Sequence, residues 1–402
     1  MFMISAPARR GAVLATAFAF LVTMMGTTLP TPLYSLYSQR LDFTEFTVTI
    51  LFAVYAFGVM FALIVFGRLS DQIGRRPILL TALVLAVISA VMFLLPLSLP
   101  LLIAARIVSG LSAGLMSGTG TAAVIDLFGP ADKARAGMLA IAVNTGGLGV
   151  GTLFAGVVAD LSSAPLTLPY AVHLGLSVLA FVTLRAFTPA PADPAPLRLQ
   201  APRLTVPAPI RGAFVRGVLA AGAGFAVCGV LTAVSALFLV RYLGIGSHTV
   251  AGLVVFLAFA FMVVGQFVAR RISSRAAMQA GCGGLVVAAA VLAVALSAES
   301  LAALLIAPIV LGVSAGLCVN AGLAATVERV DPAQRGAVSS AFFAGLYLML
   351  AVPAIGVGAL SLAIGLRESG LVFAGLVALL AAAVGVADIA ARGSAARATP
   401  LP

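Results

Sequence analysis

Long apolar runs recur along the whole chain, and they restrict its possible folds more than any other feature. We count twelve runs, each close to the roughly 20 residues that a helix needs to span the hydrocarbon core of a bilayer. Their approximate limits are residues 11–36, 46–66, 77–96, 99–126, 136–160, 168–187, 212–240, 248–269, 276–297, 300–326, 336–361 and 369–391. The runs predict an all-α polytopic membrane protein with twelve transmembrane helices in the lipid bilayer.

The composition argues against the other classes of protein. Of 402 residues, 62% are hydrophobic and 9% are charged, whereas soluble domains carry about 25% charged residues. The net charge of +11 is spread over short loops, which is typical of topology signals and not of a nucleic-acid-binding domain. The three cysteines, Cys228, Cys282 and Cys318, lie in apolar runs, so we interpret them as small buried residues.

The sequence shows no catalytic constellation. Lys133 is the only lysine and no glycine-rich loop precedes it, and the two histidines, His173 and His248, are far apart. We therefore expect neither an ATP-driven pump nor an enzyme, and neither a cofactor nor a metal ion.

A proline-rich segment divides the chain between the sixth and seventh runs. Repeated prolines in residues 188–211 disfavour a helix and favour an extended linker. We expect an N-terminal six-helix bundle in residues 1–187, a cytoplasmic linker in residues 188–211 and a C-terminal six-helix bundle in residues 212–402. The run after Arg9 and Arg10 is too long for the core of a signal peptide, and we interpret it as the first transmembrane helix.

Basic residues indicate the orientation of the chain in the membrane. If the N-terminus is cytoplasmic, nearly all of the 23 basic residues fall in cytoplasmic segments. The exceptions are Arg106, which lies within a helix, and three arginines in segments on the other side of the membrane, Arg40, Arg241 and Arg367. The excess predicts that both termini are cytoplasmic.

The two halves of the sequence are repeats. Gly110 aligns with Gly312, and the same offset of 202 residues pairs Ser112–Leu115 with Ser314–Leu317 and Pro130 with Pro332. This constant register predicts a duplication whose copies are related by an axis normal to the membrane.

A charged segment, Gly67 to Pro77, separates the second and third runs. It combines Gly67, Asp71, Gly74, Arg75 and Arg76. Gly74 suits a tight turn that a β-carbon would crowd, and the segment ends in a proline that suits the first turn of a helix.

These features together resemble the major facilitator superfamily. Residues 67–76 are similar to its signature G-x-L-a-D-r-x-G-R-R/K between helices two and three, and residues 106–114 are similar to its fourth-helix motif R-x-x-x-G-x-x-x-G. Residues 147–156 resemble the fifth-helix antiporter motif G-x-x-x-G-P-x-x-G-G only in part, because Thr152 replaces its proline and Ala155 one glycine. The segment Leu29 to Tyr34 also resembles bacterial members of the superfamily.

The resemblance implies a pseudo-symmetric 6+6 architecture and secondary active transport of a small molecule by alternating access. It also implies a proton or other ion gradient, a bacterial inner membrane and a monomer. By the same resemblance, Asp71 would dock near Gly336 at the start of helix eleven, where exposed amides favour an anion. Asp126 would then pair with Arg75 or Arg76, and the cluster would latch the outward-open state.

Arg106 is the main candidate for coupling or substrate binding, because a guanidinium within a span is costly and usually faces a partner or a water-filled cavity. The alternative is a structural donor that holds helix one or a kinked backbone. Further polar candidates are either substrate ligands or interhelical hydrogen-bonding groups: Tyr34, Tyr55, Asn144, Gln266, Asn320 and Tyr347. A set of helix glycines serves close packing or gating: Gly110, Gly114, Gly147, Gly151 and Gly156.

The leading functional hypothesis is proton-linked efflux of amphipathic compounds. The middles of helices one, two, seven, eight and eleven carry no Asp or Glu, which favours a neutral or anionic substrate over a strongly cationic one. One alternative is an importer or exchanger of a small organic anion, and another is a membrane sensor that kept the fold without transport.

Overall fold

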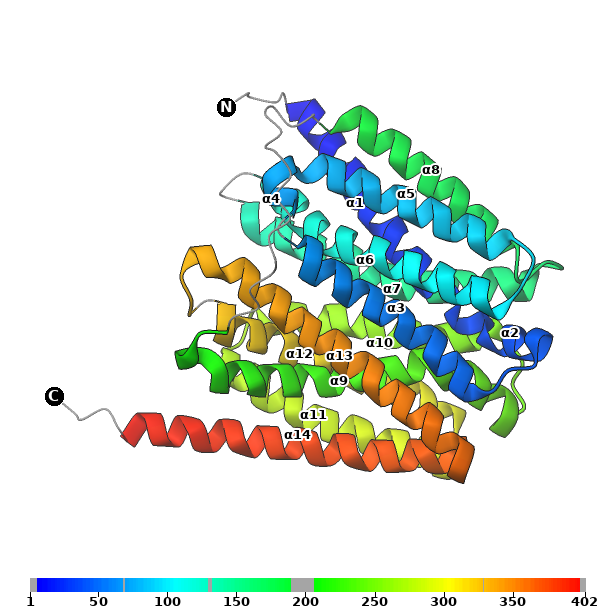
Figure 1. Ribbon diagram of the computed structural model, residues 1–402. Coiled ribbons are helices and arrows are strands. Elements are labelled where there is room, and N and C mark those ends of the chain that lie inside the picture. The colour runs from blue at the N-terminus through cyan, green and yellow to red at the C-terminus, as the bar shows by residue number, and fades with distance from the viewer. Residues whose placement is uncertain (1–5, 68, 129–131, 189–205, 328, 398–402) are drawn as a thin grey trace.

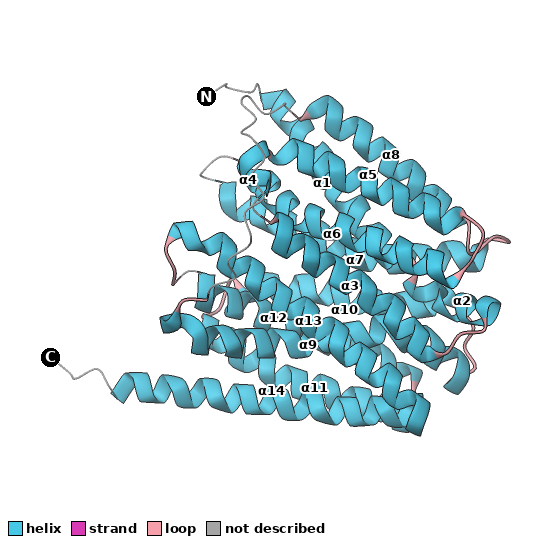
Figure 2. Cartoon of the chain, in the orientation of Figure 1, coloured by secondary structure: helices cyan, strands magenta, loops and turns pink. Residues whose placement is uncertain are grey.

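The computed structural model describes residues 6–67, 69–128, 132–188, 206–327 and 329–397 of the chain. All regular structure in these residues is helical (Figure 2), and twelve segments are long and apolar enough to cross a membrane. The helices before the proline-rich segment are α1 (Ala6–Thr28), η1 (Thr31–Leu33), α2 (Tyr34–Leu41), α3 (Glu45–Phe66), α4 (Leu69–Ile73), α5 (Arg75–Leu94), α6 (Leu99–Leu127), α7 (Lys133–Leu161) and α8 (Leu168–Phe187). The helices after it are η3 (Ala208–Ile210), α9 (Arg211–Tyr242), α10 (His248–Ala269), α11 (Ser274–Ser297), α12 (Leu301–Val327), α13 (Pro332–Ile364) and α14 (Leu366–Arg397).

The long helices run roughly parallel and antiparallel to one another (Figure 1). The start of α1 and the end of α14 lie on one side of the bundle, which we call the termini side; α2 lies on the opposite side (Figure 1). The predicted twelve-helix fold is confirmed, and the predicted spans match the observed helices closely. Most of the expected linker, residues 189–205, lies outside the described residues.

The helix packing repeats between the two halves. In the first half α6 packs against α5, α3 and α1; in the second half α12 packs against α11, α10 and α9. The helices α5 and α8 pair as α11 and α14 do, and α1 and α7 pair as α9 and α13 do. The sequence repeat therefore corresponds to a repeat of helix contacts, which gives the pseudo-symmetric 6+6 architecture.

Glycines at equivalent positions allow the same close approach in both halves. A β-carbon at Gly110 of α6 would collide with the carbonyl oxygen of Tyr55 in α3, and one at Gly312 of α12 would collide with that of Ala258 in α10. One turn further along, a β-carbon at Gly114 would collide with the carbonyl oxygen of Val59, and one at Gly316 with that of Met262. Without a hydrophobic force between helices in lipid, such backbone contact provides van der Waals packing that holds the bundle together.

The first transmembrane segment is interrupted, which the continuous span predicted for residues 11–36 did not anticipate. The helix α1 ends at Thr28, and η1 and α2 follow after a turn. Pro30 and Pro32 explain the break, because proline has no N–H for the helix ladder and its ring clashes with the preceding turn.

The charged segment after α3 is also more structured than a simple hinge. It contains the short helix α4, and Gly74 then turns the chain into α5 with φ +92° and ψ 158°. Only glycine adopts this backbone conformation readily, so the expectation of a tight turn at Gly74 is met.

The glycine contacts make a stability prediction for α12. Gly316→Ala is expected to destabilise the protein by about 1–3 kcal/mol, because the added carbon overlaps the backbone of α10. Gly283→Ala in α11 is the matched control, since nothing lies within 4 Å of the added carbon and alanine stabilises a helix interior by about 0.5–1 kcal/mol. Thermal unfolding midpoints in detergent should therefore move in opposite directions. An equal rise for both variants would contradict the packing role of Gly316.

Candidate functional site

Two helix pairs join the halves: α7 packs against α10, and α3 packs against α13. The two pairs are equivalent under the repeat. On the first, Thr152 Oγ1 donates to the carbonyl oxygen of Gly252 at 3.0 Å, and Gln266 Nε2 lies 3.5 Å from Thr145 Oγ1. On the second, Tyr55 and Tyr347 are close neighbours, and a β-carbon at Gly358 of α13 would collide with the Thr49 side chain of α3. We call these two pairs the seams, and any movement of one half against the other must change their contacts.

Asp160 closes the first seam at the side opposite the termini. Its carboxylate accepts hydrogen bonds from the backbone N–H groups of His248 and Thr249 at 2.9 Å each, and from the Ser247 hydroxyl at 2.7 Å. The His248 ring nitrogen Nδ1 lies 2.8 Å from the same carboxylate. Asp160 thus binds the N-terminus of α10, where unpaired amides and the helix dipole favour an anion.

A second polar contact lies on the same side of the bundle. Glu45, at the start of α3, forms an ion pair with Arg241 at the end of α9. The segments η1 and α2 also pack against α9 there. The opposite side is therefore held closed by contacts between the halves, and we call the Asp160 and Glu45 contacts together the opposite-side clamp.

The halves also contact each other on the termini side. There an arginine binds a backbone carbonyl group, and a glycine packs beside a serine. Arg270 Nη1, just after α10, donates to the carbonyl oxygen of Ala134 in α7 at 3.1 Å. A β-carbon added to Gly67, at the end of α3, would lie 3.3 Å from Ser340 Oγ in α13. The charged segment after α3 thus begins beside the first turns of α13, the neighbourhood that the family resemblance implies.

Two arginines of that segment, Arg75 and Arg76, contact groups of the first half. Arg75 Nε lies 3.1 Å from Asp126 Oδ2 at the end of α6, so Asp126 is paired with one of its two expected partners. Arg76 Nη2 donates to the carbonyl oxygen of Arg185 at 2.7 Å. Gly336 is exposed near the start of α13, whereas the side chain of Asp71 lies outside the described residues.

Arg106 is buried and binds two other helices. Its Nη1 donates to the carbonyl oxygen of Thr27 at 2.6 Å, its Nε donates to that of Leu51 at 3.3 Å, and its guanidinium lies 4.3 Å from the centre of the Tyr55 ring. Thr27 is in the last turn of α1, where carbonyl groups lack partners within the helix and a cation is favoured. The geometry is that of a structural donor holding the broken end of helix one.

The structure brings four of the predicted residues together. Tyr34, Tyr55 and Tyr347 are buried beside Arg106, and we call these four residues the central cluster. Tyr347 comes from α13, so both halves contribute to it. No hydrogen-bond partner reaches the Tyr34 hydroxyl from the described part of the chain.

The remaining polar candidates lie elsewhere. Asn144 Nδ2 is 3.5 Å from Ser117 Oγ within the first half, Gln266 lies on the seam of α7 and α10, and Asn320 is partly buried in α12. The fifth-helix glycines contact different partners: β-carbons at Gly147 and Gly151 would meet α1, and one at Gly156 would meet α10 of the other half.

Sequence reasoning did not identify the opposite-side clamp, or a buried carboxylate in α14. Asp388 is 4% exposed, lies 3.7 Å from Arg216 Nε and accepts a hydrogen bond from Gln279 Nε2 at 3.2 Å. One signal for the clamp was present, since Ser247 is a typical helix N-cap residue and Asp160 ends the fifth span. The pairing itself depends on how the halves dock, which the sequence pattern does not contain.

Comparisons with known proteins agree with this geometry. The family model for the Major Facilitator Superfamily matches residues 16–354, while no curated protein matches the sequence. A bacterial homologue of the human lysosomal transporter Spinster, inward-facing and unoccupied, has a similar structure, with a TM-score of 0.78 at 16% identity over 96% of this chain and 98% of that chain. A mutant of the nucleoside transporter NupG is similar with a TM-score of 0.74 at 13% identity over 94% and 99%.

At these identities the two structures establish the fold, and the family match establishes the relationship. The match extends over most of the chain. The chain therefore belongs to the Major Facilitator Superfamily and is a membrane transporter rather than an enzyme.

Proposed function

We propose that this protein is a secondary active transporter that exports small amphipathic compounds in exchange for protons. The two halves, residues 1–187 and 212–402, would rock against each other across the seams, joined by the cytoplasmic linker 188–211. The termini side would face the cytoplasm of a bacterial cell, because nearly all arginines lie there. A monomer suffices for this mechanism, since both halves are in one chain.

The observation that carries the mechanism is the distribution of contacts along the seams. On the opposite side the halves are joined by charged groups, in the Asp160 and Glu45 contacts. On the termini side Arg270 binds a backbone carbonyl, and the charged segment after α3 lies at the start of α13. Each end therefore has contacts that separate without exposing apolar core, as alternation between two open states requires.

The central cluster supports an uncharged amphipathic substrate. It combines three tyrosines, each with an apolar ring and one hydroxyl, with a cation whose Nε and Nη1 donors are already bound to carbonyl groups. An anion would have to compete with these bonds. An alternative substrate class, a small organic anion, is therefore less well supported than a neutral amphiphile.

A transport assay tests this proposal. Purified protein in proteoliposomes should move chloramphenicol, a neutral amphipathic probe, against its gradient when a pH gradient is imposed. A difference of one pH unit stores about 1.4 kcal/mol per proton, so coupling to one proton sustains about a tenfold concentration ratio. Benzoate and tetraphenylphosphonium serve as the anionic and cationic comparisons.

A protonophore should abolish accumulation in this assay, and protein-free liposomes should show none. If the protein moved benzoate and neither of the other probes, the proposal of amphiphile export would be wrong. Exchange of a small organic anion would then be the better explanation. No movement of any probe under any ion gradient would favour a membrane sensor that has lost transport.

The opposite-side clamp makes a second prediction. Asp160→Ala removes a carboxylate that binds α10 from the other half, and each charged hydrogen bond is worth about 1.5–3 kcal/mol. We expect at least a tenfold shift toward states in which the opposite side is open. Spin labels on Leu161→Cys and Gly246→Cys, two exposed positions on either side of the seam, would report it as a longer distance.

Asp132→Ala is the matched control, because Asp132 pairs with Arg135 three residues away on the same half. It should leave the distance distribution unchanged. An unchanged distribution in Asp160→Ala would show that the carboxylate does not hold the halves together.

The charged segment after α3 makes a third prediction. Asp71→Asn should slow transport while leaving expression and thermal stability unchanged, because the anion that the resemblance places at the start of α13 loses its charge. Initial transport rates and unfolding midpoints of the same preparations measure both. If the variant transported at the wild-type rate, Asp71 would have no part in the proposed latch.

A further inference from the structure

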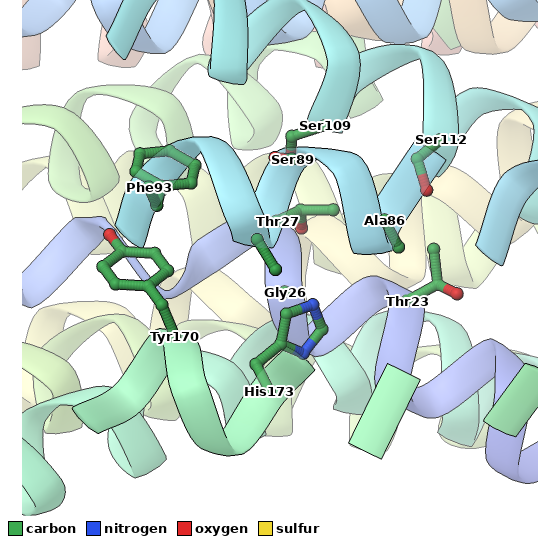
Figure 3. Close-up of a pocket in the computed structure, with 11 residues that line it drawn as sticks. Thr23, Gly26, Thr27, Ala86, Ser89, Phe93, Ser109, Ser112, Tyr170 and His173 are labelled. Atoms are coloured by element: carbon green, nitrogen blue, oxygen red, sulfur yellow. The ribbon is translucent and has the colours of Figure 1, made fainter. Parts of the chain in front are cut away.

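A polar cavity lies inside the first half, away from both seams. It is enclosed by α1, α5, α6 and α8, and it has room for about one water molecule. Figure 3 shows its polar and aromatic lining, which consists of Thr23, Thr27, Ser89, Phe93, Ser109, Ser112, Tyr170 and His173, together with Gly26, Ala86 and Ala90. A cavity with this many hydroxyl groups is unusual inside a bundle whose other contacts are mostly apolar.

His173 is a titratable group that faces this space. It is 4% exposed, and its ring points from α8 toward Gly26 of α1 (Figure 3). A β-carbon at Gly26 would overlap the imidazole, so the glycine provides the place for the ring. The Ser177 hydroxyl lies 3.3 Å from Nε2, while Nδ1 has no hydrogen-bond partner among the described residues.

The hydroxyl groups around His173 present acceptors to the cavity. Thr23 and Thr27 donate their protons to carbonyl groups of α1 at 2.8 and 2.7 Å. Ser89 donates to Ala105 at 3.0 Å, and Ser112 donates to Ala82 at 2.7 Å. Because a hydroxyl has one proton and two lone pairs, their oxygens can then only accept, and an acceptor-lined cavity stabilises a donor such as water or an imidazolium.

A cavity of the second half has a different chemistry. It lies among α9, α11, α12, α13 and α14, and Ser235 is the only polar residue in a lining of Val230, Leu231, Val234, Ser235, Phe238, Leu292, Leu296, Leu304, Val357, Leu366, Gly370 and Phe373. A cavity inside this bundle can therefore be lined almost wholly by apolar groups, so the polar lining of the first cavity calls for a separate explanation.

The cavity is connected to the central cluster through Thr27. The Thr27 side chain lines the cavity, and its carbonyl oxygen accepts a hydrogen bond from Arg106, whose guanidinium lies over the Tyr55 ring. Tyr170 is the other titratable group in the lining, and its hydroxyl is hydrogen-bonded to that of Tyr37 at 2.9 Å; the lining residues of α1 and α5 are uncharged. Arg106 is not part of the lining, and its bond to the Thr27 carbonyl joins it to the cavity.

We propose that this cavity is a buried proton site, in which His173 takes up a proton at Nδ1 and a water molecule links the imidazolium to the surrounding hydroxyl oxygens. The proton comes from the aqueous phase and returns to it, and no other bond is made or broken. Its role in coupling rests on the proton-linked transport proposed above, whereas the protonation itself does not. The site would set the conformation of the central cluster through Thr27 and Arg106.

Protonation can be read on the native residue by nuclear magnetic resonance of protein labelled with ¹⁵N-histidine. The chain has two histidines, so His248→Gln leaves the signals of His173 alone and assigns them. Over a titration from about pH 8 down to about pH 3 we expect a reversible change from the neutral ring to imidazolium. A ring that stays neutral in one tautomer over the whole range would overturn the inference.

Coupling is tested with His173→Gln in the chloramphenicol assay. The variant should still equilibrate the probe down its gradient but should lose accumulation driven by a pH gradient. Thr81→Ala is the control, because this hydroxyl on the exposed face of α5 bonds only the carbonyl of Pro77 in its own helix. Proton-driven accumulation retained in His173→Gln would overturn the coupling role, even where transport itself is established. Titration of His173 in protein that moves no probe would instead overturn the proposed function and support the proton site.

Discussion

A polar group inside a bilayer must find its partners within the protein, because hydrocarbon offers none. Arg106 illustrates the consequence. Among the described residues no carboxylate pairs with it; its charge is instead held by the carbonyl groups of Thr27 and Leu51 and the face of Tyr55. The carbonyl of Thr27 is free to accept because two prolines break helix one directly after it. The broken helix, the buried cation and the tyrosines therefore form one structural unit, and a change in any of them alters the others.

Close backbone contact gives each half its rigidity. The glycines of α6 and α12 bring those helices against α3 and α10 in the same register, and interfaces packed this tightly do not deform gradually. The seam of α7 and α10 also has such contacts, at Gly156 and Gly252, but the contacts between the halves at the two sides of the bundle include the charged groups of Asp160, Glu45 and Arg270. Charged groups can exchange a protein partner for water at modest cost once they reach the membrane surface. Rocking of rigid halves across polar-ended seams is the motion that this division favours.

The fold was largely predictable from the sequence, and the site only in part. Hydrophobic length and the 202-residue repeat are properties of the chain itself, so the helices and their duplication were found almost at their observed limits.

Pro30 and Pro32 were visible in the sequence, yet their effect on helix one was not anticipated. Helix one was named as one alternative partner of Arg106, but the acceptors at Thr27 and Leu51 could not be found, because backbone carbonyl groups leave no mark in a sequence. The Asp160 contact was missed for another reason: it joins residues on two halves whose docking depends on the whole packing. His173 was noted as a titratable group, but its cavity became apparent only when Gly26 was seen to make room for the ring.

The two halves share a fold but have diverged in chemistry. Arg106 corresponds to Pro308, and the polar cavity of the first half contrasts with a cavity of the second half lined mostly by leucine, valine and phenylalanine. A duplicated scaffold starts with equal halves, and burying a cation or a histidine in lipid lowers stability unless something offsets the cost. The second half buries Asp388 beside Arg216, whereas the first half buries Arg106 and His173, which are connected through Thr27. The second half, with its apolar cavities, then serves as the body against which the first half moves. This asymmetry is what a transporter needs if one half binds and releases the coupling ion while both halves contribute to the central cluster.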